Sequence, residues 1–267
     1  MIKDIQNQKD LRNIPIQKVG VKDVEIPLKI ERKPLQGNNK PDLEVVFAKA
    51  KMSVSLPSCF KGTHMSRFIE ILNKYQKESI LIDDIEHILF DMKNKLEATC
   101  AYLRFDFKYF IKKIAPISKL EGLMAYDCAF EGEIDEDCNF KFFLIVKVPI
   151  TTLCPCSKEI SKYGAHNQRA KLKIKISYKK EEIIWLEDLI KTAESCASSE
   201  LYPLLKREDE KFVTETAYEN PKFVEDVIRD IVKKLDENDI VEFYEVEMEA
   251  FESIHNHNAW AYQKCYK

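Results

Sequence analysis

The stretch "VFAKAKMSVSL" at residues 46–56 places an apolar side chain at every second position. Successive side chains of a β-strand point to opposite faces of a sheet, so this alternation predicts a strand with one buried face. The stretch before it, "VEIPLKI" at 24–30, alternates in the same way. The two stretches predict a pair of half-buried strands, joined by a hairpin loop in the turn-rich "LQGNNKPD" at 35–42.

Two helices are expected after this pair, the first over residues 64–77. In the second, Ile85, Leu89, Met92 and Leu96 keep helical spacing. Alternation then returns in "AYLRFDFKYF" at 101–110, and "GLMAYDCAFEGEI" at 122–134 is typical of a fourth strand. The connection between these strands is expected within "KIAPISKLEG" at 113–122.

The second half of the chain repeats this order of elements. Strands are expected in "FKFFLIVKVPI" at 140–150 and "KLKIKISY" at 171–178, followed by helices near 186–200 and 221–236. Further strands are expected in "IVEFYEVEMEAFESI" at 240–254, with a bulge between Phe243 and Tyr244, and in "AWAYQKC" at 259–265. The sequence thus predicts an α+β protein of two ββααββ units, 1–132 and 133–267, with antiparallel sheets and helices on one face.

The charge balance limits the classes of function. Lys and Arg total 42 against 45 Asp and Glu, which gives a net charge of -3 and argues against a general nucleic-acid binder. The first residues are polar, and no apolar run approaches the roughly 18–20 residues that span a bilayer. We therefore expect a soluble cytoplasmic protein with no membrane partner. Its 8 cysteines are scattered, so most are expected to be thiols rather than disulfides.

The stretch "TTLCPCSKEISKYGAHNQRA" at 151–170 combines two cysteines, a histidine and several basic residues. Its "CPC" lacks the C-x-x-C spacing of thioredoxin-like redox sites, and a structural zinc site usually needs four protein ligands. Cys154 and His166, with one further ligand from elsewhere, would instead leave an open position for a catalytic water. A loop with buried thiols and a surface histidine explains the composition equally well.

Two further clusters carry possible chemistry. In "SLPSCFKGTHMSRF" at 55–68, Lys61, His64 and Arg67 surround the start of a predicted helix, where backbone N–H groups favour anions. A helix cap with solvated charges is the simpler interpretation of that cluster alone.

The second cluster, "FESIHNHNAW" at 251–260, holds Glu252, His255 and His257 near a strand end. Alternate residues of a strand share a face, so both histidines are expected to reach one place. A pair of surface histidines is the alternative.

With these residues considered together, the sequence resembles the type IB GTP cyclohydrolase family. The resemblance rests on several long stretches spread over nearly the whole chain rather than on one motif. One departure is Asn258, where the family leads us to expect an aspartate. The matching stretches are residues 4–30, 55–68, 151–169, 198–226 and 251–259.

The resemblance implies a tunnelling fold, in which tandem ββααββ units assemble through their sheets into barrels with active sites at subunit interfaces. It also implies that GTP and water give 7,8-dihydroneopterin triphosphate and formate, the first step of tetrahydrofolate and pterin biosynthesis. A homotetramer is the expected assembly, with GTP as the substrate. Exposed sheet edges independently favour a closed homo-oligomer.

Roles for individual residues also follow from the resemblance. The ion would be zinc, manganese or iron(II), and such an ion can lower the pKa of bound water to about 7. Glu215 would accept hydrogen bonds from the N1–H and amino group of guanine. The implied metal ligands are Cys154, which also has a catalytic role, His166, Glu200 and, more weakly, Glu242. Glu252, His255 and His257 would complete the catalytic wall, and Lys61, His64, Arg67 and Lys158 would bind the triphosphate.

Three alternatives stay open at this stage. An archaeal-type cyclohydrolase of the same superfamily would release a cyclic-phosphate pterin, and product analysis distinguishes it. A nitrile reductase of the same fold would use a nucleophilic cysteine without metal, against which the pairing of Cys154 with His166 argues. A metal-stabilised binding module without turnover would unfold on chelation. The role of Cys156 is open under each of them.

Overall fold

The computed structural model describes residues 6, 8–34, 41–75 and 82–267, and of residues 82 and 83 only the backbone. Most of the predicted hairpin loop at 35–42 and the end of the predicted helix at 64–77 lie outside these residues. The strands are β1 (Ile16–Arg32), β2 (Asp42–Leu56), β3 (Ala101–Ile114), β4 (Glu121–Ile134), β5 (Phe140–Leu153), β6 (Asn167–Tyr178), β7 (Val241–Ala250) and β8 (Ala259–Tyr266). The helices are α1 (Met65–Tyr75), α2 (Ile82–Lys95), α3 (Pro155–Ile160), α4 (Leu186–Glu194), α5 (Arg207–Glu219) and α6 (Val224–Asp236).

The strands form one sheet whose order follows the chain, from β1 to β8. The pairs β1–β2, β2–β3, β5–β6, β6–β7 and β7–β8 are antiparallel. This confirms the predicted combination of an antiparallel sheet with helices. Consecutive strands lie next to each other even where helices connect them, as between β2 and β3 and between β6 and β7.

Two helices were absent from the prediction. The helix α5 was missed because its sequence, "REDEKFVTETAYE", has no continuous apolar stripe, and only Asp209 and Ala217 are buried. The six-residue α3 is too short to show helical periodicity and has no buried residue.

The predicted bulge exists on β7 but lies one to two residues earlier. Ser177 pairs with Phe243 and Tyr178 pairs with Val241, so Glu242 is the unpaired residue. Phe243 and Tyr244 are both buried, which explains the slip in apolar parity that the sequence shows there.

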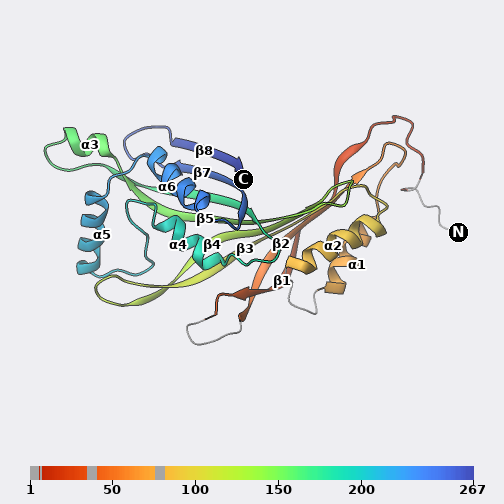
Figure 1. The fold of residues 1–267 in the computed structure, drawn as a ribbon, viewed down its shortest axis with the longest axis horizontal. Helices are drawn as coiled ribbons and strands as arrows, with labels where there is room; N and C mark the ends of the chain where they lie inside the picture. Colours follow the sequence, from red (N-terminus) through yellow and green to blue (C-terminus); the bar gives the residue numbers. More distant parts are fainter. Residues whose placement is uncertain (1–5, 7, 35–40, 76–81) are drawn as a thin grey trace. The chain divides into compact units, whose positions relative to one another are not determined.

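The chain divides into two compact units, of which the first comprises residues 1–108 and 129–143. Its buried residues include the apolar parity of β2, from Val46 to Leu56, and apolar residues of α1 and α2. These two helices lie side by side, in the yellow-orange part of the ribbon (Figure 1). The helix α2 approaches β4 at Gly132, where an added Cβ would lie 2.5 Å from Cγ2 of Ile85. On the other parity of β2, Val45 and Phe47 are exposed.

The second unit comprises residues 109–128 and 144–267. The apolar stripe expected for α6 is buried from Val224 to Leu235, but Phe223, directly before the helix, is exposed. Leu189 and Ile190 of α4 are also buried. The alternation of β6 is also confirmed, since Leu172, Ile174 and Ile176 are buried while the lysines between them are at least partly exposed.

These units differ from the two sequence halves. The strands β3, β4 and β5 each contribute residues to both units, because they are 14 residues long and cross the boundary. The predicted boundary between the two ββααββ repeats, between residues 132 and 133, therefore stays a prediction. No helix within the described residues combines the length and apolarity needed to cross a bilayer.

Candidate active site

The loop between β5 and β6 brings Cys154 and His166 together through the backbone. The last pair of the two strands is Leu153 with Asn167. Directly beyond it, the N–H of Cys154 donates to the carbonyl of His166 at 3.1 Å. The N–H of Ser157 donates to Sγ of Cys154 at 3.4 Å, and its Oγ accepts from the N–H of His166 at 3.1 Å. Cys154 is a half-buried free thiol, whereas Cys156 is exposed.

The side chain of His166 belongs to a polar cluster that includes Gln168 and Glu252. Nδ1 of His166 lies 2.9 Å from Oε1 of Gln168, and Nε2 of Gln168 donates to Oε1 of Glu252 at 3.2 Å. The other oxygen of Glu252 lies 3.9 Å from Nδ1 of His166. Glu252 was predicted as part of the catalytic wall, and the structure places it beside a predicted metal ligand.

Sequence reasoning missed Gln168, although the pattern of β6 contains a signal for it. Gln168 occupies the same parity as the buried residues Ala170 and Leu172. A polar side chain at such a position needs a hydrogen-bond partner, because burying it without one costs about 1–3 kcal/mol.

Glu200 lies in a second cluster, around the buried ammonium of Lys113 on β3. Nζ of Lys113 lies 2.8 Å from Oε1 of Glu194 and 2.7 Å from Oε2 of Glu200. It also lies 4.7 Å from the ring centroid of Tyr202. The hydroxyl of Tyr126 donates to Glu194 at 2.6 Å.

Burial dominates the electrostatics of this second cluster. It raises the pKa of Glu194 even though Lys113 acts in the opposite direction, and it raises the pKa of Tyr202 to about 12. Neither Lys113 nor Glu194 was predicted as part of the site. A lysine on the otherwise apolar parity of β3 was the signal available in the sequence.

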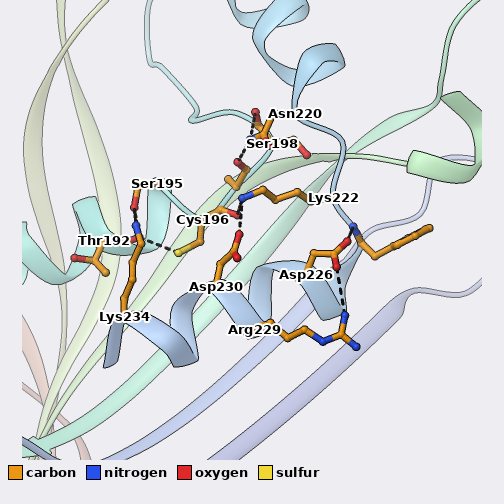
Figure 2. A network of polar contacts seen from close by, with 12 residues as sticks. Thr192, Ser195, Cys196, Ser198, Asn220, Lys222, Asp226, Arg229, Asp230 and Lys234 are labelled. Atoms are coloured by element: carbon orange, nitrogen blue, oxygen red, sulfur yellow. Dashed lines mark hydrogen bonds and ion pairs between the residues drawn. The ribbon is translucent and has the colours of Figure 1, made fainter. Parts of the chain in front are cut away.

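Figure 2 shows a network of polar contacts that ties the residues just after α4 to Asn220 and Lys222. Nζ of Lys222 donates to the carbonyl of Cys196 at 3.0 Å and pairs with Asp230 at 2.6 Å. Nδ2 of Asn220 donates to the carbonyl of Ala197 at 2.9 Å. The N–H of Leu153 donates to Oγ of Ser198 at 3.1 Å. The residue before Cys154 is thus bonded to the segment that ends at Glu200.

Two of the predicted site residues lie on the helices that the sequence analysis missed, Lys158 on α3 and Glu215 on α5. Lys158 on α3 donates to the carbonyl of Tyr218 on α5, and its Nζ lies 4.5 Å from the ring centroid of Tyr218. Glu215, also on α5, is exposed and lies 3.8 Å from Lys211. No contact in this part of the structure joins Glu215 to Cys154 or His166, so its role stays a prediction.

The side chains of His255 and His257 lie together as expected, but the backbone that carries them is a loop and not a strand. Both are exposed and lie between the end of β7 and the start of β8. Their rings stack, with centroids 5.0 Å apart and an interplanar angle of 15°. Two exposed imidazoles at one place are compatible with the proton-transfer role, which stays a prediction.

Glu242 is separated from the other predicted ligands. It is the exposed bulge residue at the start of β7, whereas the end of β7, at Ala250, pairs with Ala170 near His166. Eight residues of strand span about 26 Å at roughly 3.3 Å per residue. Within one chain Glu242 therefore lies far from His166, and its role as a metal ligand stays a prediction.

Three of the four residues predicted to bind the triphosphate, Lys61, His64 and Arg67, lie in the first unit, whereas Lys158 lies in the second. His64 directly precedes α1, and its carbonyl accepts from the N–H of Arg67 at 3.1 Å. The guanidinium of Arg67 donates to the carbonyl of Lys95 at 2.9 Å, while Lys61 is exposed. These residues surround the start of a helix as predicted, and their grouping with the residues of the second unit stays a prediction.

The donor types fit an ion of the zinc type, because thiolate, imidazole and carboxylate are its usual ligands. Within the described residues, however, no three Cys, His, Asp or Glu side chains converge closely enough to hold an ion. Cys154 and His166 are adjacent, while the carboxylate of Glu200 is bound to Lys113. Only Oε2 of Glu200 is bound to Lys113, and the side chain of Glu200 is 39% exposed.

Comparisons with solved structures show the fold of this chain. A uricase from Bacillus fastidious superposes with a TM-score of 0.56 at 11% identity, covering 94% of this chain and 93% of that one. A urate oxidase mutant from Bacillus sp. TB-90 gives a TM-score of 0.54 at 13% identity, covering 94% and 99%. At such low identity the likeness concerns the fold alone, a mixed fold built on an antiparallel sheet.

Comparisons of sequence go further. Residues 2–261 match the family model described as type I GTP cyclohydrolase folE2. The "GTP cyclohydrolase FolE2" of Geotalea uraniireducens is 52% identical over 258 residues, which cover 97% of this chain and 91% of that protein. The protein of the same name from Thermosipho africanus is 50% identical over 263 residues, covering 97% and 96%. This chain therefore belongs to the FolE2 family of type I GTP cyclohydrolases.

Proposed function

We propose that this chain catalyses the metal-dependent hydrolysis of GTP to 7,8-dihydroneopterin triphosphate and formate, the first step of tetrahydrofolate and pterin biosynthesis. The observation that carries the proposal is the backbone pairing of Cys154 with His166 in a member of a GTP cyclohydrolase family. A free thiol and an imidazole at adjacent positions supply two of the three protein ligands that a catalytic metal site needs.

Cys154, His166 and Glu200 would hold the ion, which is zinc, manganese or iron(II). Bound there, it would supply a water whose pKa is lowered to about 7, the nucleophile needed at C8 of guanine. The network around Lys222 and Asn220 supports this assignment, because it holds the segment of Glu200 against the end of β5.

The other predicted residues serve binding and proton transfer. The carboxylate of Glu215 accepts from N1–H and the exocyclic amino group of guanine, which selects guanine over adenine. His255 and His257 exchange protons as C8 leaves as formate, because an imidazole can both accept and donate a proton. Lys61, His64, Arg67 and Lys158 neutralise the triphosphate.

The finer architecture belongs to the same proposal. We infer two tandem ββααββ units of a tunnelling fold, with α3 and α5 as additions to the second. The strands β1 and β8 end the sheet, and pairing of such edges between chains would close barrels in a homotetramer. A cytoplasmic location stays a prediction from the sequence.

The proposal is tested by assaying the purified protein with GTP and zinc, manganese or iron(II). Formate and the fluorescence of the oxidised pterin are the readouts, and mass analysis separates the linear triphosphate from a cyclic phosphate. Cys154→Ala should abolish turnover, whereas Cys59→Ala, at an exposed thiol of the first unit, should leave it intact. A folded wild-type protein that produces no formate with any of these metals contradicts the proposal and favours a binding module.

A further inference from the structure

Gln168 is a buried amide that the proposed chemistry does not use. Its side chain is 9% exposed, on β6 opposite Thr152 of β5. Three polar groups surround it, namely the imidazole of His166, the carboxylate of Glu252 and the hydroxyl of Thr152. An amide has one end that donates and one that accepts, so its orientation determines what each neighbour must do.

Glu252 sets that orientation. An ionised carboxylate only accepts hydrogen bonds, and its Oε1 lies 3.2 Å from Nε2 of Gln168. A rotation of the amide by 180° would place Oε1 of Gln168 against this carboxylate oxygen, with two acceptors facing each other. The hydroxyl of Thr152, also 3.2 Å from Nε2, accepts in the observed orientation and adds a second bond to it.

The fixed amide in turn sets the proton of His166. With Nε2 committed to Glu252 and Thr152, Oε1 of Gln168 faces Nδ1 of His166 at 2.9 Å and can only accept from it. Nδ1 must therefore carry a hydrogen. The second oxygen of Glu252, 3.9 Å from Nδ1, favours the same arrangement, because a carboxylate attracts an N–H and repels a nitrogen lone pair.

We propose that Gln168 is a positioning residue that keeps His166 in its Nδ1–H tautomer, leaving the Nε2 lone pair available for a metal ion. This inference rests on the proposed function only in one respect, namely that a metal ion binds the lone pair on Nε2 of His166. Ligand histidines in metal sites usually donate their other N–H to a carboxylate or carbonyl, which fixes the ring and strengthens the ligand. Here the amide oxygen of Gln168 accepts the N–H of His166, and the carboxylate of Glu252 fixes the orientation of that amide.

The tautomer is tested first, without metal, by long-range ¹H–¹⁵N spectra of the full chain labelled with ¹⁵N-histidine. The spectra are recorded at increasing alkaline pH until the histidine resonances no longer change with pH, so that the imidazoles are neutral. His166→Asn assigns the resonances. We expect His166 in the Nδ1–H form in the wild type and a mixture of tautomers in Gln168→Leu. A wild-type protein in the Nε2–H form, or a tautomer that does not respond to Gln168→Leu, overturns the proposal.

Glu252→Gln provides a second variant that keeps the shape of the cluster. An amide at residue 252 can donate as well as accept, so Gln168 is no longer held in one orientation. The proposal expects its His166 spectrum to shift toward the mixture seen in Gln168→Leu. Gln263→Leu, the same substitution at an exposed position of β8, is the matched control and should leave the spectrum of His166 unchanged.

Metal affinity is the second readout, measured by competition of zinc with a chelator in the same proteins. Loss of an outer partner of a ligand typically costs about 10–100-fold in affinity, and we expect Gln168→Leu to fall in this range. Gln263→Leu should bind as tightly as the wild type. An unchanged affinity in Gln168→Leu overturns the positioning role. If the tautomer and affinity results hold but GTP gives no formate, the proposed function fails while the role of Gln168 stands.

Discussion

The two polar clusters of the second unit hold their carboxylates in opposite ways. Around Lys113, Glu194 and Glu200 share one buried ammonium, so charge faces charge. Around Gln168, Glu252 faces a neutral amide that passes its influence to His166. Lys113 neutralises part of the charge that Glu200 would offer to a metal ion. The amide of Gln168 orients the ring of His166 and leaves the lone pair on its Nε2 free. In the proposed metal site, the lone pair of His166 would be available to the ion, whereas Oε2 of Glu200 is shared with Lys113.

The largest expected effect comes from breaking the ionic cluster with Lys113→Met. This change leaves the buried carboxylate of Glu194 without its cation, and removing one partner of a buried pair costs about 3–5 kcal/mol. Denaturant unfolding measures the loss. Lys112→Met is the control, because Lys112 is the exposed neighbour and its pair with Glu121 is worth at most about 1 kcal/mol. If both variants lost the same free energy of unfolding, the buried pair of Lys113 with Glu194 would stabilise the fold no more than an exposed pair.

Glu200→Gln tests whether the ionic cluster also supplies a metal ligand. A neutral amide is a poor zinc ligand, and we expect zinc affinity to fall by at least about tenfold. Chelator competition measures it. Glu242→Gln, at the exposed bulge residue of β7, is expected to bind zinc like the wild type. A loss of affinity in Glu242→Gln would contradict the separation of Glu242 from this site.

Asp209 adds a third kind of environment, a buried carboxylate held by neutral donors alone. It accepts from the N–H groups of Ile117, Ser118 and Lys206 and from the hydroxyl of Ser118. Burial raises its pKa, but these bonds outweigh burial and the net pKa lies well below its usual range.

A lowered carboxyl pKa stabilises the folded state above the unfolded pKa of about 3.9, and the gain is lost as the pH falls toward the folded value. The melting temperature of the wild type should therefore exceed that of Asp209→Asn at pH 7, and the gap should narrow below about pH 4. Thermal melts over a series of pH values measure it. A gap that stays constant on acidification would mean that the carboxylate charge at residue 209 does not stabilise the fold.

The smallest effect is expected on the exposed face of α5. Lys211 and Glu215 are an i, i+4 pair at 3.8 Å, and such pairs contribute about 0.3–0.5 kcal/mol. Lys211→Ala should change the free energy of unfolding by no more than this amount. Glu215→Gln should be equally mild in unfolding and yet abolish GTP turnover, if Glu215 binds guanine. An active Glu215→Gln enzyme would remove this residue from the site.

Much of the fold and part of the site followed from local patterns in the sequence. Alternation in β2 and β6 and helical spacing in α2 and α6 predicted those elements, because burial of one face imposes a period that is visible along the chain. The position of Cys154 and His166 at a strand-to-strand loop was predictable for the same reason. The helix α5 was not, since its sequence has no apolar stripe to mark it.

The partners of the buried polar residues had to come from the three-dimensional structure. Lys113 is 81 residues from Glu194 and 87 from Glu200, and Gln168 is 84 from Glu252. A polar residue at an otherwise apolar position of a strand indicates that its side chain needs a hydrogen-bond partner. The sequence does not identify that partner, because the pairing depends on strand register and on loops that meet only after folding. Glu242 and Glu252 show the converse, since both carboxylates follow from the sequence while the β6–β7 register separates one of them from His166.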